Sequence, residues 1–294
     1  MVEKWLLTGG AGQVGAALRR NPPPGVEIVA PSRTELDLAR LPAALPLDGV
    51  AAIVNCGAYT AVDAAESEPG LARAINAEAP GRLAEAAARA GIPIVQVSTD
   101  YVFGDGEGPW REDAPIDPKS VYGRTKAAGE AAVRASGACY AIVRTAWVVS
   151  ADGRNFVKTM LRLGGERDTL RVVADQRGTP THAGDLALAL AAVTSRFTAD
   201  PARASGVWHC ANAGETTWHG LAEQVFAAAA RHGLKIPQTV EPITTAEYPT
   251  PAARPADSRL DCSKIAHDLG IRLRPWQEAV DEIVGELARQ GQIA

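Results

Sequence analysis

The chain has 294 residues, of which 46% are hydrophobic and 22% charged, a composition typical of a globular protein with a large core. Its net charge of −4 argues against a nucleic-acid-binding surface, which would need a basic face. No apolar run is long enough to cross a membrane, and a strand begins almost at the first residue, so we expect neither a membrane partner nor a secretory signal. The four cysteines are scattered and make no CxxC pair or metal-ligand pattern, which predicts reduced thiols in a cytoplasmic protein without a metal site.

The first predicted unit is a strand, a tight turn and a helix. The apolar run Trp5–Leu7 leads into a TGxxGxxG pattern with glycines at 9, 12 and 15, and a helical pattern follows. Such a turn presents bare backbone N–H groups at a helix N-terminus, which suits a phosphate group. The spacing is a variant of the dinucleotide-binding fingerprint, and a glycine-rich surface turn is the alternative.

Strands and helices then alternate through the first half of the chain. We expect strands at 26–30, 51–56, 92–98 and 141–149, and alanine-rich helices at 71–90 and 126–135. Continuous apolar strands separated by helices predict an α/β fold with a parallel, doubly wound, Rossmann-like sheet. In such sheets the ligand lies beyond the carboxyl ends of the strands, where residues 55–60 and 98–101 would follow two of them.

The pattern changes after about residue 150, where proline and glycine become denser. We expect helices at 155–164, 183–195, 217–231, near 263 and at 277–289, a short strand at 170–173, and a strand at 207–210 that rejoins the main sheet. The predicted dinucleotide-binding domain therefore comprises residues 1–150 and about 175–212. A smaller, mixed α/β substrate-binding lobe comprises about 151–174 and 213–294.

A tyrosine and a lysine provide the second chemical signal. Lys126 follows Tyr122 by four residues, which places both side chains on one face of a helix. A nearby ammonium favours the phenolate and lowers the pKa of a tyrosine, so the pair would act as a general acid near neutral pH. The proline-rich loop before it would put Tyr122 at the rim of a pocket, and an exposed helix start is the alternative.

The third signal is Ser98-Thr99, at the end of a predicted buried strand. A hydroxyl there would donate a hydrogen bond to a substrate carbonyl oxygen as that oxygen gains negative charge. The alternative is a hydroxyl that satisfies a strand-end turn.

The tip of the second strand indicates which cofactor the glycine turn would hold. NAD-binding enzymes usually have an acidic residue there for the ribose 2′-hydroxyl, whereas this strand ends Val29-Ala-Pro-Ser-Arg33 without a carboxylate. Ser32 and Arg33 would instead bind a 2′-phosphate, so we predict NADPH as the cofactor and NADH as the second choice. The alternative for Arg33 is a solvated loop cation.

Nearly end to end, the motifs resemble those of the extended short-chain dehydrogenases/reductases and, within them, the dTDP-4-dehydrorhamnose reductases. The segments that carry the resemblance are Thr8-Gly-Gly-Ala-Gly-Gln-Val-Gly15, Asn55-Cys-Gly-Ala-Tyr-Thr-Ala-Val-Asp63, Ser98-Thr-Asp-Tyr-Val-Phe103, Tyr122-Gly-Arg-Thr-Lys126, Arg144-Thr-Ala-Trp-Val148, Asp175-Gln176, and Arg254-Pro255 with Ser258-Arg-Leu260. The resemblance implies NADPH-dependent reduction of the C4 ketone of dTDP-4-dehydro-6-deoxy-L-mannose to dTDP-L-rhamnose, the last step of dTDP-L-rhamnose synthesis. Thr99, Tyr122 and Lys126 would be the catalytic residues.

The resemblance, together with the phosphate argument, also implies two sets of binding residues. The cofactor would contact Gly9, Gly12, Gln13, Val14, Gly15, Ser32, Arg33, Asp37, Leu38, Cys56, Gly57, Ala58, Tyr59, Tyr122 and Lys126. The dTDP-sugar would contact Thr99, Asp100, Tyr101, Val102, Trp147, Asn155 and Arg259. For Trp147, a buried aromatic at a strand end is the alternative.

Assembly and activity each leave an alternative. Some relatives form a magnesium-linked dimer through glutamates, one of them near the start of the first helix, where this chain reads Gly15-Ala16-Ala17. Asp185 alone would not make a metal site, so we expect a monomer or a weak homodimer without a bridging metal. The alternative activities are another dTDP-4-keto-deoxysugar reductase or epimerase, and a non-catalytic regulatory subunit of the kind associated with methionine adenosyltransferase.

Overall fold

A computed structural model describes residues 2–200 and 202–291, and a six-stranded sheet in the order β10-β5-β4-β3-β1-β2 lies at its centre. The strands are β1 (Glu3–Thr8), β2 (Val26–Val29), β3 (Val50–Asn55), β4 (Ile94–Thr99), β5 (Tyr140–Thr145) and β10 (Gly206–His209). Every neighbouring pair is parallel. Because β1 lies between β2 and β3, the carboxyl ends of β1 and β3 form the switch point where doubly wound sheets bind ligands. The predicted fold class is confirmed.

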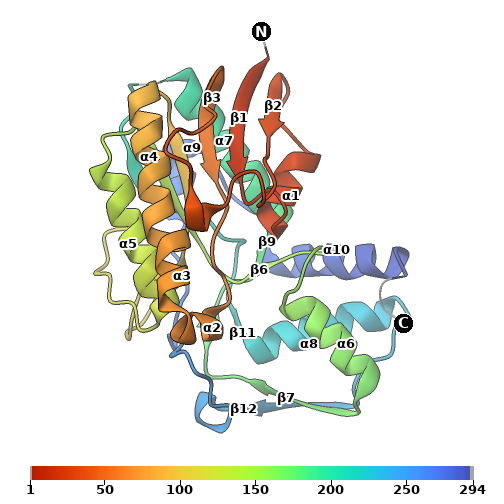
Figure 1. The fold of residues 1–294 in the computed structure, drawn as a ribbon. Coiled ribbons are helices and arrows are strands. Elements are labelled where there is room, and N and C mark those ends of the chain that lie inside the picture. The colour runs from red at the N-terminus through yellow and green to blue at the C-terminus, as the bar shows by residue number, and fades with distance from the viewer. Residues whose placement is uncertain (1, 201, 292–294) are drawn as a thin grey trace.

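Helices cover both faces of this sheet (Figure 1). The helices of one face are α1 (Gln13–Arg20) and α7 (Ala183–Ala199); those of the other are α3 (Pro69–Arg73), α4 (Ala79–Ala90) and α5 (Val121–Ala135). Strand residues such as Trp5, Ile53 and Val143 are fully buried. Strands covered on both faces gain from continuous apolar residues, which explains why they show no alternation in the sequence.

The predicted helix at 71–90 contains an irregular turn. A π-helical segment, η2 (Ala74–Glu78), joins α3 to α4. Inside it, the buried amide of Asn76 hydrogen-bonds the N–H and C=O of Tyr59 at 2.8 and 3.1 Å and the hydroxyl of Thr125 at 3.2 Å. Such bulges form where tertiary contacts outweigh regular helical bonding, so the amphipathic pattern alone could not reveal this one.

The predicted strand at 141–149 is wrong as a single element. β5 ends at Thr145, and β6 (Val148–Val149) then pairs with β9 (Thr181–His182) instead of continuing in the main sheet. Between them, Trp147 has a left-handed backbone conformation with φ 46°. A bulky residue rarely adopts this conformation, and it breaks the strand.

A second group of elements lies beside the carboxyl ends of the main strands (Figure 1). Its elements are α6 (Phe156–Glu166), β7 (Thr169–Val173), α8 (Trp218–Arg231), β12 (Thr239–Ile243) and α10 (Trp276–Arg289). β7 and β12 pair in parallel, and Leu161, Val225 and Ile283 share an apolar core with them. Between these elements the chain returns through α7 and β10 to the main sheet, as predicted for 207–210. The domain boundaries themselves stay a prediction.

Short elements complete the fold. They are α2 (Val62–Ser67), β8 (Arg177–Gly178), β11 (Thr216–Thr217), α9 (Ser263–Leu269), and the 3-10 turns η1 (Leu38–Arg40), η3 (Asp100–Val102) and η4 (Thr245–Glu247). Within residues 2–200 and 202–291, no helix has the length and apolar character that crossing a bilayer requires.

Candidate active site

The glycine turn after β1 packs against the turn after β3. Gly9 has φ +71°, and a Cβ on it would lie 2.5 Å from the backbone nitrogen of Gly57. A Cβ on Gly15 would lie 2.2 Å from the carbonyl oxygen of Gly9, and one on Gly57 would lie 2.4 Å from Leu38. Glycine is therefore required at positions 9 and 15, where a Cβ would meet backbone atoms, whereas the Leu38 side chain could move aside for one at position 57.

The N-terminus of α1 is open to an anionic ligand. Gly12 is exposed and caps α1 without a side-chain hydrogen bond, and the first turn holds no acidic residue. A Cβ on Gly12 would meet only the oxygen of Gly9, at 3.3 Å, so non-neighbouring protein atoms leave room at this position. Free N–H groups and the helix dipole suit a pyrophosphate in that space. The turn thus fits a dinucleotide.

The tip of β2 carries a carboxylate that the sequence did not reveal. Glu35 folds back, and its carboxylate accepts the backbone N–H and the hydroxyl of Ser32 at 2.7 and 2.8 Å. These hydrogen bonds lower the pKa of Glu35. Arg33 is largely exposed and lies 3.8 Å from Asp37, so its guanidinium is accessible to a ligand phosphate. The expectation that the tip of β2 has no carboxylate is therefore wrong, because the carboxylate of Glu35 already binds Ser32.

Thr99 and Tyr122 meet where α5 begins beside the end of β4. Ser120 caps α5 by accepting the N–H of Gly123 at 3.1 Å. A Cβ on Gly123 would lie 2.2 Å from the carbonyl oxygen of Tyr101, so α5 approaches η3 very closely. The rings of Tyr101 and Tyr122 pack edge-on at 5.5 Å, and Thr99 lies close enough to Tyr122 to influence the pKa of the phenol.

Tyr122 is buried rather than at a pocket rim, since only 9% of it is exposed. Burial raises the pKa of Tyr122 to about 12, although the neighbouring Thr99 side chain opposes the change. The expected lowering of this pKa by Lys126 is wrong for this structure, because the ammonium of Lys126 donates to the carbonyl oxygen of Val97 at 2.7 Å. A raised pKa keeps the phenol protonated, which is the form that a proton donor needs.

Lys126 is itself buried, and its neighbours act on its charge in opposite directions. Burial lowers the pKa of Lys126 to about 8, whereas the carboxylate of Glu130 opposes the change. The thiol of Cys56 lies in the same region, and burial raises the pKa of Cys56 to about 12, so the thiol stays neutral. Near neutral pH, Lys126 is therefore the cation of this part of the site.

A buried ion pair supports Lys126 and was not predicted. Arg144 on β5 donates to the two carboxylate oxygens of Glu130 at 2.8 and 2.7 Å, and the hydroxyl of Ser98 donates to Glu130 at 2.6 Å. Ser98 thus binds Glu130, although Ser98-Thr99 together formed the third predicted signal. Glu130 follows Lys126 by four residues, so helical spacing could have placed it on the same face. No local pattern identifies its strand partner.

The three residues after Thr99 divide between the site and the core. The hydroxyl of Thr99 donates to the buried carboxyl of Asp100 at 2.8 Å. Burial, together with the nearby Asp100, raises the pKa of Tyr101. Val102 is fully buried in an apolar cluster with Phe103, so the structure places this predicted substrate contact in the core.

Comparison with known proteins gives the family. The sequence matches the RmlD substrate binding domain family over residues 3–289. It is 44% identical to a dTDP-4-dehydrorhamnose reductase of Sinorhizobium fredii, over 98% of this chain and 99% of that protein. The chain belongs to the dTDP-4-dehydrorhamnose reductase family.

Two further relatives bear on the cofactor and the substrate. A solved dTDP-4-dehydrorhamnose reductase of Bacillus anthracis, in complex with NADP, has a TM-score of 0.85 to this chain at 32% identity, with 97% of this chain and 100% of that chain covered. A Streptomyces antibioticus protein, a probable dTDP-4,6-dihydroxy-2-methyloxan-3-one 4-ketoreductase, is 40% identical over 95% of this chain and 94% of its own length. The likeness to both extends over almost the whole chain.

In this member of the dTDP-4-dehydrorhamnose reductase family, Trp147 is held by stacking. Its ring lies parallel to that of Trp218 on α8, with centroids 3.6 Å apart and planes 5° apart. On the same ring, a Cβ added to Gly178 would lie 2.3 Å from the indole. Strained residues of this kind gather at functional sites, and the tertiary packing keeps the left-handed backbone in place.

Gln13 and Asn155 bind each other. The side-chain oxygen of Gln13 accepts hydrogen bonds from Asn155 at 2.9 Å and from Ser150 at 2.8 Å, while Asn155 caps α6 by accepting the N–H of Lys158 at 3.2 Å. This link ties the glycine turn to the start of the second group of elements. Direct contact of Asn155 with the sugar nucleotide stays a prediction.

Arg259 lies in a separate ion-pair cluster. Its guanidinium donates to Asp257 at 2.8 Å, to Glu215 at 2.6 Å and to the carbonyl oxygen of Gly108 at 2.7 Å. The structure therefore does not bring Arg259 together with Thr99 and Tyr122, and its contact with substrate stays a prediction.

Asp185, the acidic residue considered as a ligand of a bridging metal, is bound by neighbouring side chains. Hydrogen bonds from His182, Arg274 and Asn212 outweigh the effect of burial and lower the pKa of Asp185. In the part of the chain that the structure describes, no group of three or more His, Cys, Asp or Glu side chains could hold a metal ion.

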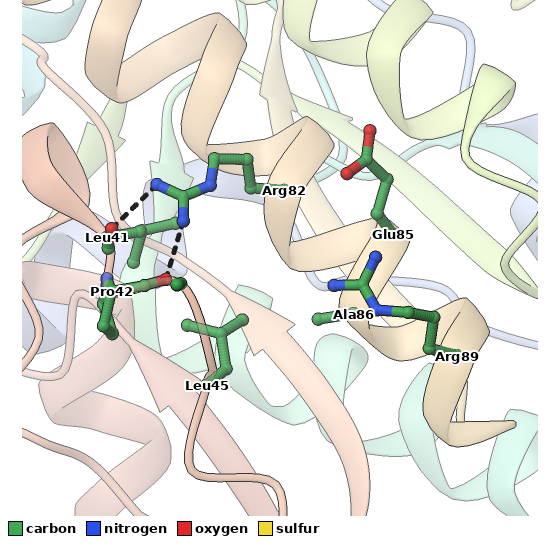
Figure 2. Close-up of a pocket in the computed structure, with 8 residues that line it drawn as sticks. Leu41, Pro42, Leu45, Arg82, Glu85, Ala86 and Arg89 are labelled. Carbon is green, nitrogen blue, oxygen red and sulfur yellow. Dashed lines mark hydrogen bonds between the residues drawn. The ribbon is translucent and has the colours of Figure 1, made fainter.

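A surface pocket lies apart from all these residues. It is formed by residues 41–45 and the outer face of α4, and Arg82 donates to the carbonyl oxygens of Leu41 and Pro42 at 2.8 and 2.6 Å (Figure 2). None of the predicted site residues lines this pocket.

Proposed function

We propose that this chain uses NADPH to reduce the C4 ketone of dTDP-4-dehydro-6-deoxy-L-mannose, giving dTDP-L-rhamnose. The observation that carries the proposal is the placement of Tyr122 beside Thr99 at the carboxyl edge of the sheet, with the buried Lys126 on the same helix as Tyr122. The 44% identity to a dTDP-4-dehydrorhamnose reductase supports this choice of substrate.

The glycine turn after β1 is suited to the dinucleotide. Its pyrophosphate would lie against the N–H groups at Gly12 and the start of α1, and Leu38 would lie near its adenosine end. When bound, the reduced nicotinamide supplies a hydride to C4 of the sugar. The NADP complex of the Bacillus anthracis relative supports this choice of cofactor.

The side chains supply the proton and the charge. Tyr122, which is protonated at neutral pH, gives its proton to the ketone oxygen as that oxygen gains negative charge. The hydroxyl of Thr99, which lies beside Tyr122, would polarise the ketone. Lys126 contributes positive charge that stabilises the developing alkoxide and binds the nicotinamide ribose.

One relative favours a second substrate. The 40% identity to a probable 4-ketoreductase acting on a different dTDP-sugar supports reduction of another dTDP-4-keto-deoxysugar as the second candidate. The regulatory-subunit alternative receives no such support, since a binding module has no need of Tyr122, Thr99 and Lys126 at one edge of the sheet.

Assembly and location belong to the same proposal. We infer a monomer or a weak homodimer without a bridging metal, because the carboxylate of Asp185 is already bound by Arg274 at 2.9 Å. The four cysteines are free, which suits the reducing cytoplasm.

Turnover tests the proposal. The purified chain is incubated with NADPH and dTDP-4-dehydro-6-deoxy-L-mannose, the oxidation of NADPH is followed, and the sugar product is identified by NMR. We expect stoichiometric dTDP-L-rhamnose. Turnover only with other dTDP-4-keto sugars would favour the second candidate, and NADPH binding without turnover of any of them would contradict both.

A further inference from the structure

A series of buried polar side chains crosses the carboxyl ends of β1, β3 and β4. Nδ2 of Asn55 donates to Oε1 of Gln96 at 2.7 Å, and Nε2 of Gln96 donates to the carbonyl oxygen of Val97 at 2.7 Å. On its other side, Oδ1 of Asn55 accepts the hydroxyl of Thr8 and, at 3.1 Å, the N–H of Gly57. Thr8, Asn55 and Gln96 are almost wholly buried, with 3%, 0% and 2% exposed. A buried network that is hydrogen-bonded in this way is rigid.

The hydrogen bonds of this network can run in one direction only. The backbone N–H of Gly57 can only donate, so the side-chain oxygen of Asn55 faces it. The amide nitrogen of Asn55 then faces Gln96 and binds the oxygen of that amide. The nitrogen of Gln96 is left to donate to the carbonyl oxygen of Val97. Gln96 is therefore held as a donor to this carbonyl by the turn after β3.

The carbonyl oxygen of Val97 is also the acceptor for Lys126. The ammonium of Lys126 donates to it at 2.7 Å, and the last paired residues of β3 and β4 are Asn55 and Gln96, so Val97 lies just beyond the end of β3. A carbonyl oxygen has two lone pairs, so it can bind the Gln96 amide and the Lys126 ammonium together. An ammonium has three N–H groups, so Lys126 keeps two of them for other partners.

The other end of the network lies against the glycine turn after β1. A Cβ on Gly9 would lie 2.5 Å from the backbone nitrogen of Gly57, the group that donates to Asn55. The stem of a lysine is flexible, so a buried ammonium keeps one position only where an acceptor anchors it. The network thus fixes the acceptor of Lys126 relative to the turn that fits the pyrophosphate.

We propose that Gln96 is a positioning residue, which holds the Val97 carbonyl so that the ammonium of Lys126 meets the nicotinamide ribose of a dinucleotide bound at the glycine turn. This inference rests on the proposed function, in which Lys126 binds that ribose. Without the Gln96 amide, the carbonyl and the ammonium can shift together, while Asn55 still binds Thr8 and Gly57. The nicotinamide half of the cofactor should then lose affinity, and the adenosine half should not.

Two ligands and one substitution test the proposal. Gln96→Met removes the amide and keeps a side chain of similar length. We expect this variant to bind NADPH about tenfold more weakly, because a buried hydrogen-bonded contact to the ribose is impaired. Its kcat should fall by roughly 10- to 100-fold, since a misplaced charge beside the reacting groups is costly. Adenosine 2′,5′-bisphosphate, which lacks the nicotinamide ribose, should keep its wild-type Kd. Calorimetric titration and steady-state kinetics measure these effects.

Two further variants make the outcome clear. Gln96→Glu keeps an acceptor for Asn55 but presents no amide N–H to Val97, so it should show the same selective loss, and it serves as the test if Gln96→Met does not fold. Gln224→Met is the matched control, because the Gln224 amide donates to Asp281 on α10 at 2.8 Å, and it should change neither Kd nor kcat.

The results that would overturn the inference are specific. A folded Gln96 variant with wild-type kcat and wild-type Kd for NADPH would show that Lys126 needs no such support. Equal weakening of NADPH and of adenosine 2′,5′-bisphosphate would show that Gln96 only maintains the fold of the glycine turn. No turnover by the wild type would instead refute the proposed function, and this inference with it.

Discussion

Replacing the Tyr122 side chain should remove the proton donor without disturbing the glycine turn after β1. We expect Tyr122→Phe to lower kcat by about 10²- to 10⁴-fold, since general-acid catalysis contributes on that order. The Kd for NADPH should change little, because the ring and its packing against Tyr101 at 5.5 Å remain. Steady-state kinetics and fluorescence titration with NADPH measure the two effects, and wild-type kcat in the variant would refute the assignment.

Arg33 and Glu35 should act in opposite directions on cofactor choice. Arg33→Ala should weaken NADPH about tenfold while leaving NADH nearly unchanged, because one exposed, charge-assisted contact to the 2′-phosphate is lost. Glu35→Gln should favour NADPH, since a carboxylate is removed from Ser32. Kd values for both cofactors measure this, with the exposed Arg89→Ala as a control. Equal losses of NADPH and NADH in Arg33→Ala would contradict the role of the arginine.

Among the elements, the first turn of α5 packs tightly against η3. Gly123→Ala would place a Cβ 2.2 Å from the carbonyl oxygen of Tyr101, so α5 must shift away from η3. We expect a loss of about 1–3 kcal/mol in the free energy of unfolding, and a lower kcat because Tyr122 moves with the helix.

Gly70→Ala in α3 is the matched control for that substitution. An added Cβ there has nothing within 4 Å, so it should be neutral or stabilise by up to about 1 kcal/mol. Urea unfolding and steady-state kinetics compare the two variants. Equal stability and equal kcat for both would show that the close approach of α5 to η3 is unimportant.

Elements with a strong local signal were predictable from the sequence, and those set by distant contacts were not. The strand, turn and helix of residues 3–20 follow from an apolar run and glycine spacing, and the YxxxK pair from helical periodicity. The break at Trp147 depends on stacking against Trp218, which lies 71 residues further along the chain. The return of Glu35 to Ser32 depends on backbone geometry at the tip of β2. For Trp147 the missing information is tertiary, whereas for Glu35 it is a local turn of the backbone that residue pattern alone does not specify.

At the scale of the whole molecule, the pair of Glu130 and Arg144 joins α5 to the sheet. Both side chains are buried, with 1% and 0% exposed. Removing Arg144 takes away the buried partner of Glu130 and leaves it only the partly exposed Arg134 at 3.1 Å, so Arg144→Met should lower the free energy of unfolding by about 3–5 kcal/mol. The double variant Glu130→Leu/Arg144→Met should recover part of that loss, because both charges of the pair are removed and only Lys126 keeps a buried charge. Urea unfolding measures both, and a double variant no more stable than Arg144→Met would contradict this account.

The whole account depends on the substrate ketone meeting Tyr122 beside the nicotinamide. A crystal structure of the complex with NADP and dTDP-L-rhamnose tests this most directly. We predict that the sugar O4 lies within hydrogen-bond distance, about 3 Å, of the Tyr122 hydroxyl, with the pyrophosphate at the glycine turn and C4 facing the nicotinamide. A sugar bound away from Tyr122 and Thr99, or a dinucleotide bound away from the turn after β1, would contradict it.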